Sequence, residues 1–334
     1  MAEPAMREAY GDALLKMGED ERVVVLDADL AKATSSGKFA AKYPERFFDM
    51  GIAEQNLMGT AAGMAISGLK PFASTFALFA AGRAYEPIRN AICYAKAPVK
   101  IVATHAGLSP NSDGGSHETI EDIALMRVLP GMTVLSPCDY RQAFDMVLQM
   151  KEMDHPAYIR MSRHPVETVT AEGSHTEIGK IDVLREGGDV CFAATGVMVA
   201  EALHAAEALE EKGIHAAVLN VHTIKPLDKE TLIRYGKSCK RMVTAEEHSV
   251  IGGLGSAVAE VLAECGGCCL KRVGIQDRFG QSGDLGELME CYGLTAKNLM
   301  ETALSMCQPL CPSKRDTLSA HNKEEERLIR SRLS

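Results

Sequence analysis

VKIVATHAGLSPNSDGGSH, residues 99–117, places a short β-branched run directly before a polar loop rich in glycine. The run Val99–Thr104 predicts a buried strand. The loop holds two histidines, Asp113 and three glycines within thirteen residues. Open parallel sheets bind ligands outside the carboxyl ends of their strands, and imidazoles there can transfer protons near neutral pH. The pattern therefore favours a proton-transfer site, with His105 and His117 as its candidates, over a plain solvated loop.

Strands and helices alternate outward from this stretch. Before residue 165, short β-branched runs predict strands at 22–26, 71–76, 99–104, 132–135 and 157–161, and longer segments predict helices at 54–68, 82–95, 118–128 and 140–153. A second cycle of the same kind occupies residues 190–263. Such alternation predicts the α/β class, with two doubly wound domains and a parallel sheet in the first. We expect domains at 1–165 and 181–312, a linker at 166–180, and a charged tail at 313–334 that is peripheral or disordered.

Composition restricts the class of protein. A length of 334 residues suits two domains, and 46% hydrophobic with 24% charged residues is ordinary for a globular protein. The net charge of −9 argues against a nucleic-acid partner. No apolar run reaches the ~18 residues that span a bilayer, and the polar first twenty residues do not resemble a signal peptide. We therefore expect a cytoplasmic protein with no membrane partner.

The ten cysteines do not form a recognisable metal site. Most stand singly in apolar stretches, where cysteine behaves as a small core residue. The cluster Cys265, Cys268 and Cys269 contains a C-x-x-C, but no second pair follows at the spacing of a zinc ribbon. Inert thiols in a reducing compartment are therefore favoured over a metal or redox role.

Two further segments supply candidates for a ligand site. Glu54, in the sequence GIAEQN of residues 51–56, starts a predicted helix that is almost free of charge. A first-turn carboxylate stabilised by the helix dipole is the ordinary interpretation, but the lack of neighbouring charge indicates burial, and a buried carboxylate needs a charged partner or a proton. Phe76 and Phe79 follow the next strand. They would ordinarily pack in the core; alternatively, they form a wall on which a flat heterocycle stacks.

Two weaker candidates remain. Arg163 follows the predicted strand at 157–161 and could bind a phosphate or carboxylate. The sequence Gly252–Ser256 (GGLGS) opens a predicted helix and partly matches a dinucleotide loop. No acidic residue ends a following strand at the expected distance, so a tight strand-to-helix turn is the better interpretation.

Together these segments resemble the middle and C-terminal domains of transketolases, which depend on thiamine diphosphate. The resemblance extends from about Asp27 to about Ala303, and it keeps the family's order and spacing. It rests on GIAEQN around Glu54, STFALF at 74–79, the H-(x)7-D-G-G-x-H loop, Ser162-Arg163 and IEDIALMR at 120–127. It implies that the domain at 1–165 is a pyrimidine-binding domain and that the domain at 181–312 is a transketolase C-terminal domain.

The resemblance also implies an activity, the transfer of a two-carbon ketol unit from a ketose phosphate to an aldose phosphate. Glu54 would hydrogen-bond the aminopyrimidine ring of thiamine diphosphate and share a proton with it, which promotes the ylide form of the cofactor. The other implied cofactor contacts are Ile52, Phe76 and Phe79. The implied sugar-phosphate contacts are Asp29, Ser35, His105, Asp113, His117 and Arg163. Of these, the two histidines would also move protons as the donor's carbon–carbon bond breaks.

Two departures from the family pattern matter. Gly82 lies where many transketolases have a further aromatic residue. The family holds the cofactor's diphosphate through Mg²⁺ (or Ca²⁺) with a Gly-Asp-Gly motif, and no Gly-Asp-Gly occurs in this sequence. A diphosphate cannot enter a low-dielectric cleft without compensating cations. We therefore expect a separate chain, the N-terminal transketolase subunit, to supply the diphosphate and metal site, in an assembly with two of each chain.

Other functions remain open at this point. The corresponding half of a 1-deoxyxylulose-5-phosphate synthase shares GIAEQ, and the beta chain of a 2-oxoacid dehydrogenase decarboxylase component has a similar two-domain plan. The two-histidine loop followed by IEDIALMR favours transketolase. A non-catalytic paralogue is disfavoured because Glu54, both histidines and Arg163 are present. A nicotinamide dehydrogenase would rest on Gly252–Ser256 alone.

Overall fold

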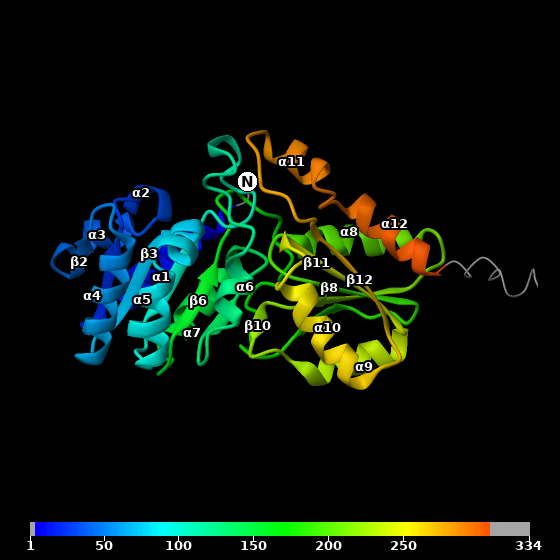
Figure 1. The fold of residues 1–334 in the computed structure, drawn as a ribbon, viewed down its shortest axis with the longest axis horizontal. Coiled ribbons are helices and arrows are strands. Elements are labelled where there is room, and N and C mark those ends of the chain that lie inside the picture. Colours follow the sequence, from blue (N-terminus) through cyan, green and yellow to red (C-terminus); the bar gives the residue numbers. More distant parts are fainter. Residues whose placement is uncertain (1–3, 308–334) are drawn as a thin grey trace, which may run out of the picture.

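Two sheets organise residues 4–307, the part of the chain that the computed structural model describes (Figure 1). The first has seven strands in the order β10-β5-β6-β4-β3-β1-β2, and the second has five in the order β12-β11-β8-β9-β7. The strands of the first sheet are β1 (Val23–Asp27), β2 (Phe47–Asp49), β3 (Lys70–Phe76), β4 (Lys100–Thr104), β5 (Thr133–Leu135), β6 (Ala157–Arg160) and β10 (Thr223–Lys225). Those of the second are β7 (Asp182–Arg185), β8 (Val190–Ala194), β9 (Ala216–Asn220), β11 (Arg241–Ser249) and β12 (Cys269–Ile275).

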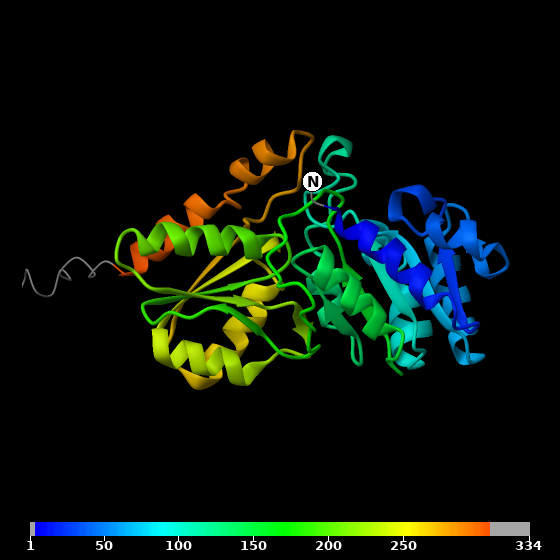
Figure 2. The same cartoon turned by 180° about the vertical axis from the view of Figure 1, so that it is seen from behind.

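Helices cover both faces of each sheet, as Figures 1 and 2 show from opposite sides. Those around the first sheet are α1 (Met6–Met17), α2 (Ala31–Thr34), α3 (Gly37–Lys42), α4 (Glu54–Ile66), α5 (Tyr85–Pro87), α6 (Asp122–Arg127) and α7 (Tyr140–Met150). Those around the second are α8 (Met198–Glu210), α9 (Lys229–Cys239), α10 (Leu254–Cys265), α11 (Leu285–Cys291) and α12 (Ala296–Cys307). Short 3₁₀ or π segments are η1 (Pro44–Arg46), η2 (Phe79–Arg83), η3 (Ile88–Tyr94) and η4 (Asn111–Asp113).

The predicted α/β class with two doubly wound units is confirmed. Neighbouring strands run parallel except at one edge of each sheet, where β10 pairs antiparallel with β5 and β7 pairs antiparallel with β9. Strand β10 lies far along the chain yet completes the first sheet. One buried apolar cluster also runs from the first sheet to the second, and it includes Leu26, Ile101, Tyr158, Ala193 and Val258. The two units therefore share a core.

Two predicted helices are wrong in detail. Residues 82–95 do not form one α-helix but two π segments, η2 and η3, separated by the short α5. Pro87 contributes to this break, because it has no N–H for the helical ladder. The helix predicted at 118–128 begins only at Asp122. Thr119 instead bonds back to Gly107 through both backbone groups, so residues 118–121 belong to the preceding loop.

None of the helices within residues 4–307 has the length and apolar character needed to cross a membrane. The tail predicted at 313–334 lies outside the described residues. The linker predicted at 166–180 contains no helix or strand.

Candidate active site

The carboxyl ends of three adjacent parallel strands, β4, β3 and β1, form the edge at which the predicted residues gather. Phe76 ends β3, and His105 directly follows β4. The ring centroids of these two residues are 3.8 Å apart, and the rings are stacked. Phe79 stacks on Phe76 at 5.7 Å, and its ring meets the His117 ring edge-on at 5.5 Å. The structure thus brings both predicted aromatic residues and both predicted histidines into one cluster.

Glu54 begins α4 and is only 4% exposed, as its uncharged surroundings predict. Its Oε1 accepts a hydrogen bond from the Arg83 guanidinium at 3.0 Å. Arg83 also lies over the Phe79 ring, 4.2 Å from its centroid. This arginine therefore links the carboxylate to the aromatic cluster. Sequence analysis missed Arg83, because nothing in its local pattern predicts a partner 29 residues away.

An open hollow of about 440 Å³ lies over the start of α4 and is lined by Ala53, Glu54, Gln55, Asn56 and Arg83. At Gly82, next to Arg83 in the chain, a Cβ would meet nothing within 4 Å. A buried carboxylate that lines an open hollow, with a neighbouring arginine that lies over an aromatic ring, suits a flat, hydrogen-bonding heterocycle. These residues fit the aminopyrimidine half of thiamine diphosphate.

His105 is held tightly in an unusual backbone conformation. Its φ is +58°, in the left-handed region that non-glycine residues seldom occupy. Its Nδ1 lies 3.0 Å from the Thr104 hydroxyl. Burial, aided by Arg163 and other nearby cations, lowers the pKa of His105 to about 3. The imidazole is therefore neutral at pH 7, and it can accept or donate a hydrogen bond without carrying charge.

Arg163 forms an ion pair with Asp113 of the 105–117 loop. Arg163 Nη1 lies 3.2 Å from Asp113 Oδ2, and both side chains are partly exposed. The guanidinium also donates to the Pro110 carbonyl at 3.4 Å. His117 lies within the same loop, with its Nδ1 3.0 Å from the Ser116 hydroxyl. A partly exposed guanidinium can exchange its weak loop contacts for an incoming anion such as a sugar phosphate.

Asp29 and Ser35 lie on a loop that Asp27 organises. The Asp27 carboxylate accepts hydrogen bonds from the hydroxyls of Thr34 and Ser36, both at 2.8 Å, and from Leu30 N at 2.6 Å. Asp29 and Ser35 both have positive φ, at +61° and +67°.

Arg7 is a further cation that sequence analysis missed. Its Nη1 donates to the Ala33 carbonyl at 3.0 Å, close to Ser35 in the chain. Burial is the main cause of the lowered pKa of His105 and of His164, and the charges of Arg163 and Arg7 add to it. The Asp27-Ala-Asp29 sequence after a strand could have signalled Asp27, whereas Arg7 lies in a helix that was not predicted.

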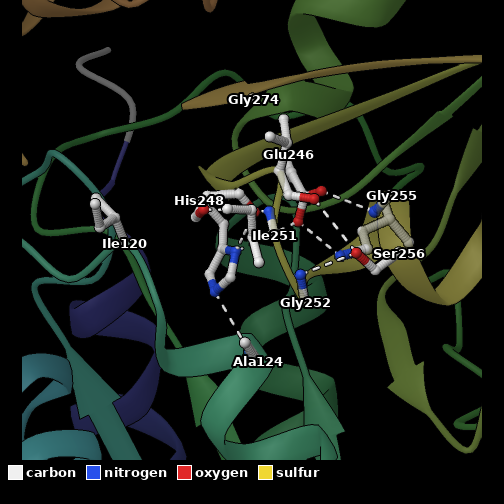
Figure 3. Close-up of polar contacts among 12 residues, drawn as sticks. Ile120, Ala124, Glu246, His248, Ile251, Gly252, Gly255, Ser256 and Gly274 are labelled. Atoms are coloured by element: carbon white, nitrogen blue, oxygen red, sulfur yellow. Dashed lines mark hydrogen bonds and ion pairs between the residues drawn. The ribbon is translucent and has the colours of Figure 1, made fainter. Parts of the chain in front are cut away.

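Three predicted features remain. Ile52 is 75% exposed on this chain. The Gly252–Ser256 turn has its amides occupied, because Leu254 N and Gly255 N donate to the buried Glu246 carboxylate at 2.6 and 2.7 Å (Figure 3). That arrangement favours the strand-to-helix turn over a dinucleotide loop. Within residues 4–307, no group of three His, Cys, Asp or Glu side chains is arranged to hold a metal ion. The cysteines at 265, 268 and 269 therefore do not form such a group.

Comparison with known families matches the model for the transketolase pyrimidine binding domain to residues 2–168 and that for the transketolase C-terminal domain to residues 179–299. A Methanocaldococcus jannaschii protein, provisionally named as a transketolase C-terminal section, is 48% identical over 89% of this chain and 95% of its own length. The 6-deoxy-6-sulfo-D-fructose transketolase subunit SqwH of Clostridium sp. MSTE9 is 45% identical, covering 89% of this chain and 93% of its own.

A solved structure described as a split gene transketolase, inactive beta4 tetramer, superimposes with a TM-score of 0.83. It shares 50% sequence identity and covers 91% of this chain and 98% of its own. At lower identity, 38%, the chain covers 47% of a Heliobacterium modesticaldum 1-deoxy-D-xylulose-5-phosphate synthase.

Proposed function

The chain belongs to the transketolase family, and from that premise we propose that it is the pyrimidine-binding, C-terminal subunit of a two-chain transketolase. The reaction is the transfer of a two-carbon ketol unit from a ketose phosphate to an aldose phosphate. One observation carries the proposal. The buried Glu54 lines an open hollow together with Arg83, and Arg83 also lies over the Phe79 ring of the cluster formed by Phe76, Phe79 and His105.

Glu54, Phe76 and Phe79 would hold the aminopyrimidine of thiamine diphosphate. When bound, the cofactor supplies the nucleophilic carbon to which the two-carbon unit is attached. Glu54 shares a proton with the pyrimidine ring, and its burial keeps water from competing for that hydrogen bond. Arg83, which pairs with this carboxylate on the chain by itself, has a half-exposed side chain and can move aside. Ile52, exposed on this chain, would contact the cofactor once the partner is in place.

The loop residues would act on the sugar. His105 is neutral at pH 7, so it can accept a hydrogen bond from a substrate hydroxyl without carrying charge. His117 and Asp113 bind further hydroxyls, and Arg163 binds the terminal anionic group. Asp29 and Ser35 approach from the loop that Asp27 holds. A sulfonate is also an anion, so the same arginine is compatible with a sulfosugar of the kind named for the Clostridium relative.

The diphosphate and its Mg²⁺ would be held mainly by a partner chain, the N-terminal transketolase subunit, with two of each chain in the assembly. Two observations support this division. Two relatives that match over 93% and 95% of their length are named as a subunit and as a section, and the split-gene neighbour is described as an inactive beta4 tetramer. No Gly-Asp-Gly occurs in the sequence.

A 1-deoxyxylulose-5-phosphate synthase half is the second candidate, because one such synthase matches at 38% identity. Donor specificity separates the two. The chain is combined with the diphosphate-binding subunit, thiamine diphosphate and Mg²⁺, and then assayed with xylulose 5-phosphate or pyruvate as donor. Turnover of xylulose 5-phosphate with an aldose phosphate acceptor is expected. Turnover of pyruvate with glyceraldehyde 3-phosphate, and of no ketose phosphate, would establish the synthase instead.

A further inference from the structure

The loop that carries His105, Asp113 and His117 is closed at its base by a single antiparallel bridge. Gly107 and Thr119 exchange two backbone hydrogen bonds, each 3.0 Å long. Gly107 has φ +64°, a conformation that glycine adopts without strain. Two residues earlier, His105 occupies the left-handed region without that freedom. The surrounding structure therefore has to hold it, and the bridge two residues away is part of that structure, together with the bond from Ala106 N to the Met161 carbonyl.

Strand β11, from the second unit, holds both sides of this bridge. Glu247 Oε1 accepts a hydrogen bond from Leu108 N at 2.8 Å, and Ser249 N donates to the Ile120 carbonyl at 2.7 Å. The Glu247 carboxylate lies directly against Gly107, since a Cβ added there would lie 2.2 Å from its Cδ. Glu247 is 4% exposed, so water does not compete for the Leu108 amide.

Among the neighbouring residues near the end of β11, Glu247 is the one whose side chain hydrogen-bonds to the loop. Its neighbours Glu246 and His248 point elsewhere in Figure 3, Glu246 toward the start of α10 and His248 toward Ala124 N, 3.3 Å from its Nε2. Arg160, at the end of β6, donates to the Glu247 carbonyl at 3.3 Å. The backbone of Glu247 is thus tied to the first sheet while its side chain reaches the loop.

We propose that Glu247 is a positioning residue for the proposed ketol transfer. It fixes the base of the 105–117 loop through the Leu108 amide and the surface of Gly107, and so sets where His105, Asp113 and His117 meet the substrate. The proposal rests on the proposed function, and it gives the second unit a part in the active site of its own chain.

The test compares E247A, E247Q and the control E246A in the reconstituted two-chain enzyme. For each variant, kcat and KM for xylulose 5-phosphate, the apparent affinity for thiamine diphosphate, and hydrogen exchange of residues 106–119 are measured. E247A is expected to lower kcat/KM roughly tenfold to hundredfold, because a small displacement of reacting groups has effects of this order. Cofactor affinity should stay the same, since the residues assigned to the pyrimidine lie outside the loop. Exchange across 106–119 should accelerate.

E247Q should recover most of the lost activity and protection, because its amide oxygen can still accept from the Leu108 amide. E246A removes a buried carboxylate from the same strand, so it should accelerate exchange at the start of α10 and leave 106–119 unchanged. The G107A variant tests the same contact by changing the loop residue that lies against the Glu247 carboxylate. Its Cβ would displace the carboxylate, so combining it with E247A should cause little loss beyond that of G107A alone.

Wild-type kinetics together with unchanged exchange in E247A would overturn the proposal, as would an E247Q variant as impaired as E247A. Should E247A fail to fold, E247D decides, since its carboxylate is one methylene short of the Leu108 amide and should give the same loop exchange and kinetic defect. Absence of ketol transfer by the wild-type pair would reject the proposed function; the exchange comparison would then decide alone whether Glu247 fixes the loop.

Discussion

Burial acts in opposite directions on the acids and the imidazoles around the 105–117 loop. It lowers the pKa of His105 to about 3 and raises the pKa of Glu247 to about 7, because a charged form loses hydration in either case. A neutral imidazole beside Arg163 adds no further positive charge where an anionic substrate would bind. The neutral state of His105 at pH 7 is therefore a property of that single buried residue, whereas Glu247, with a pKa of about 7, is partly ionised there.

Glu54→Ala should abolish most activity of the reconstituted enzyme, by about 10²–10⁴-fold, the usual contribution of a positioned acid–base group. Folding should be little affected, because the partner Arg83 is half exposed and can be solvated. Steady-state kinetics and thermal unfolding check both parts. Glu86→Ala, which removes an exposed carboxylate from the neighbouring α5, is the matched control and should retain activity. Near-normal turnover of E54A would remove the role assigned to this carboxylate.

Glu247 also predicts a pH dependence of stability. Burial raises its pKa from 4.5 to about 7, against the opposing effects of Arg160 and the Leu108 amide. The folded chain then keeps a proton that the unfolded chain releases, so this contribution is complete below about pH 4.5 and is lost as the pH rises through 7. Glutamine does not titrate. The stability of E247Q relative to wild type should therefore increase by about 2–3 kcal/mol between pH 5 and pH 8.

Urea unfolding at the two pH values measures this change directly. The neighbouring charged groups, Asp122, Glu118 and Arg160, are present in both proteins, so their own titration largely cancels in the difference. A stability difference between E247Q and wild type that is constant with pH would show that Glu247 is ionised in the folded chain throughout this range.

At the scale of elements, strand ends position the site and short turns shape it. Asp27 ends β1 and holds the loop bearing Asp29 and Ser35 through two hydroxyls and one amide. Phe79 begins a π segment, η2, which ends with Arg83. Such π segments are frequent at functional sites. Here η2 places an aromatic ring and a guanidinium on the same side of the cluster.

Asp27→Ala should destabilise the chain by about 2–3 kcal/mol, because the buried hydroxyls of Thr34 and Ser36 lose their acceptor. It should also raise KM for the donor sugar, since Asp29 and Ser35 lose their support. Denaturant unfolding and donor titration of the reconstituted enzyme test this. Asp20→Ala, near the other end of the strand, removes partly exposed ion pairs with Arg22 and Lys70 and a hydrogen bond from the Arg22 amide. It should cost about 1 kcal/mol, with KM unchanged. Equal effects of both variants would contradict the assignment.

Local patterns predicted the central strands of both sheets, because β-branched runs between helical segments have few alternative structures, but they missed the edge strands β7, β10 and β12. They failed where distant residues decide the outcome. The edge strand β10 is only three residues long, and its strand conformation depends on antiparallel pairing with β5. The local sequence of residues 118–121 predicts a helix, but Thr119 instead forms two backbone hydrogen bonds with Gly107. In the site, the residue types and positions of Glu54 and the histidines made them predictable. Arg83 and Glu247 were not predictable, because their partners in the structure lie 29 and 139 residues away in the sequence.

At the scale of the whole molecule, the two units share one apolar core, and both contact the 105–117 loop. Ion pairs such as Arg127 with Glu260 and backbone bonds such as Ser249 to Ile120 join the units at several points. A ligand that contacts the 105–117 loop therefore acts on both. The hollow at Glu54, by contrast, opens outward from the first sheet and is lined by only five residues. It offers walls for a heterocycle, and a single cation, Arg83, which Glu54 already engages.

This asymmetry predicts how the isolated chain responds to the cofactor. Thiamine diphosphate carries several negative charges at one end, and a low-dielectric site holds them only with bound cations. The chain alone should therefore show no Mg²⁺-dependent binding of thiamine diphosphate by calorimetry, whereas the pair with the diphosphate-binding subunit should bind it. The pair containing E54A, which keeps the diphosphate site intact, should bind with affinity weakened but still dependent on Mg²⁺. Tight, Mg²⁺-dependent binding by the isolated chain would mean that its own residues hold the diphosphate, and the two-chain site would have to be abandoned.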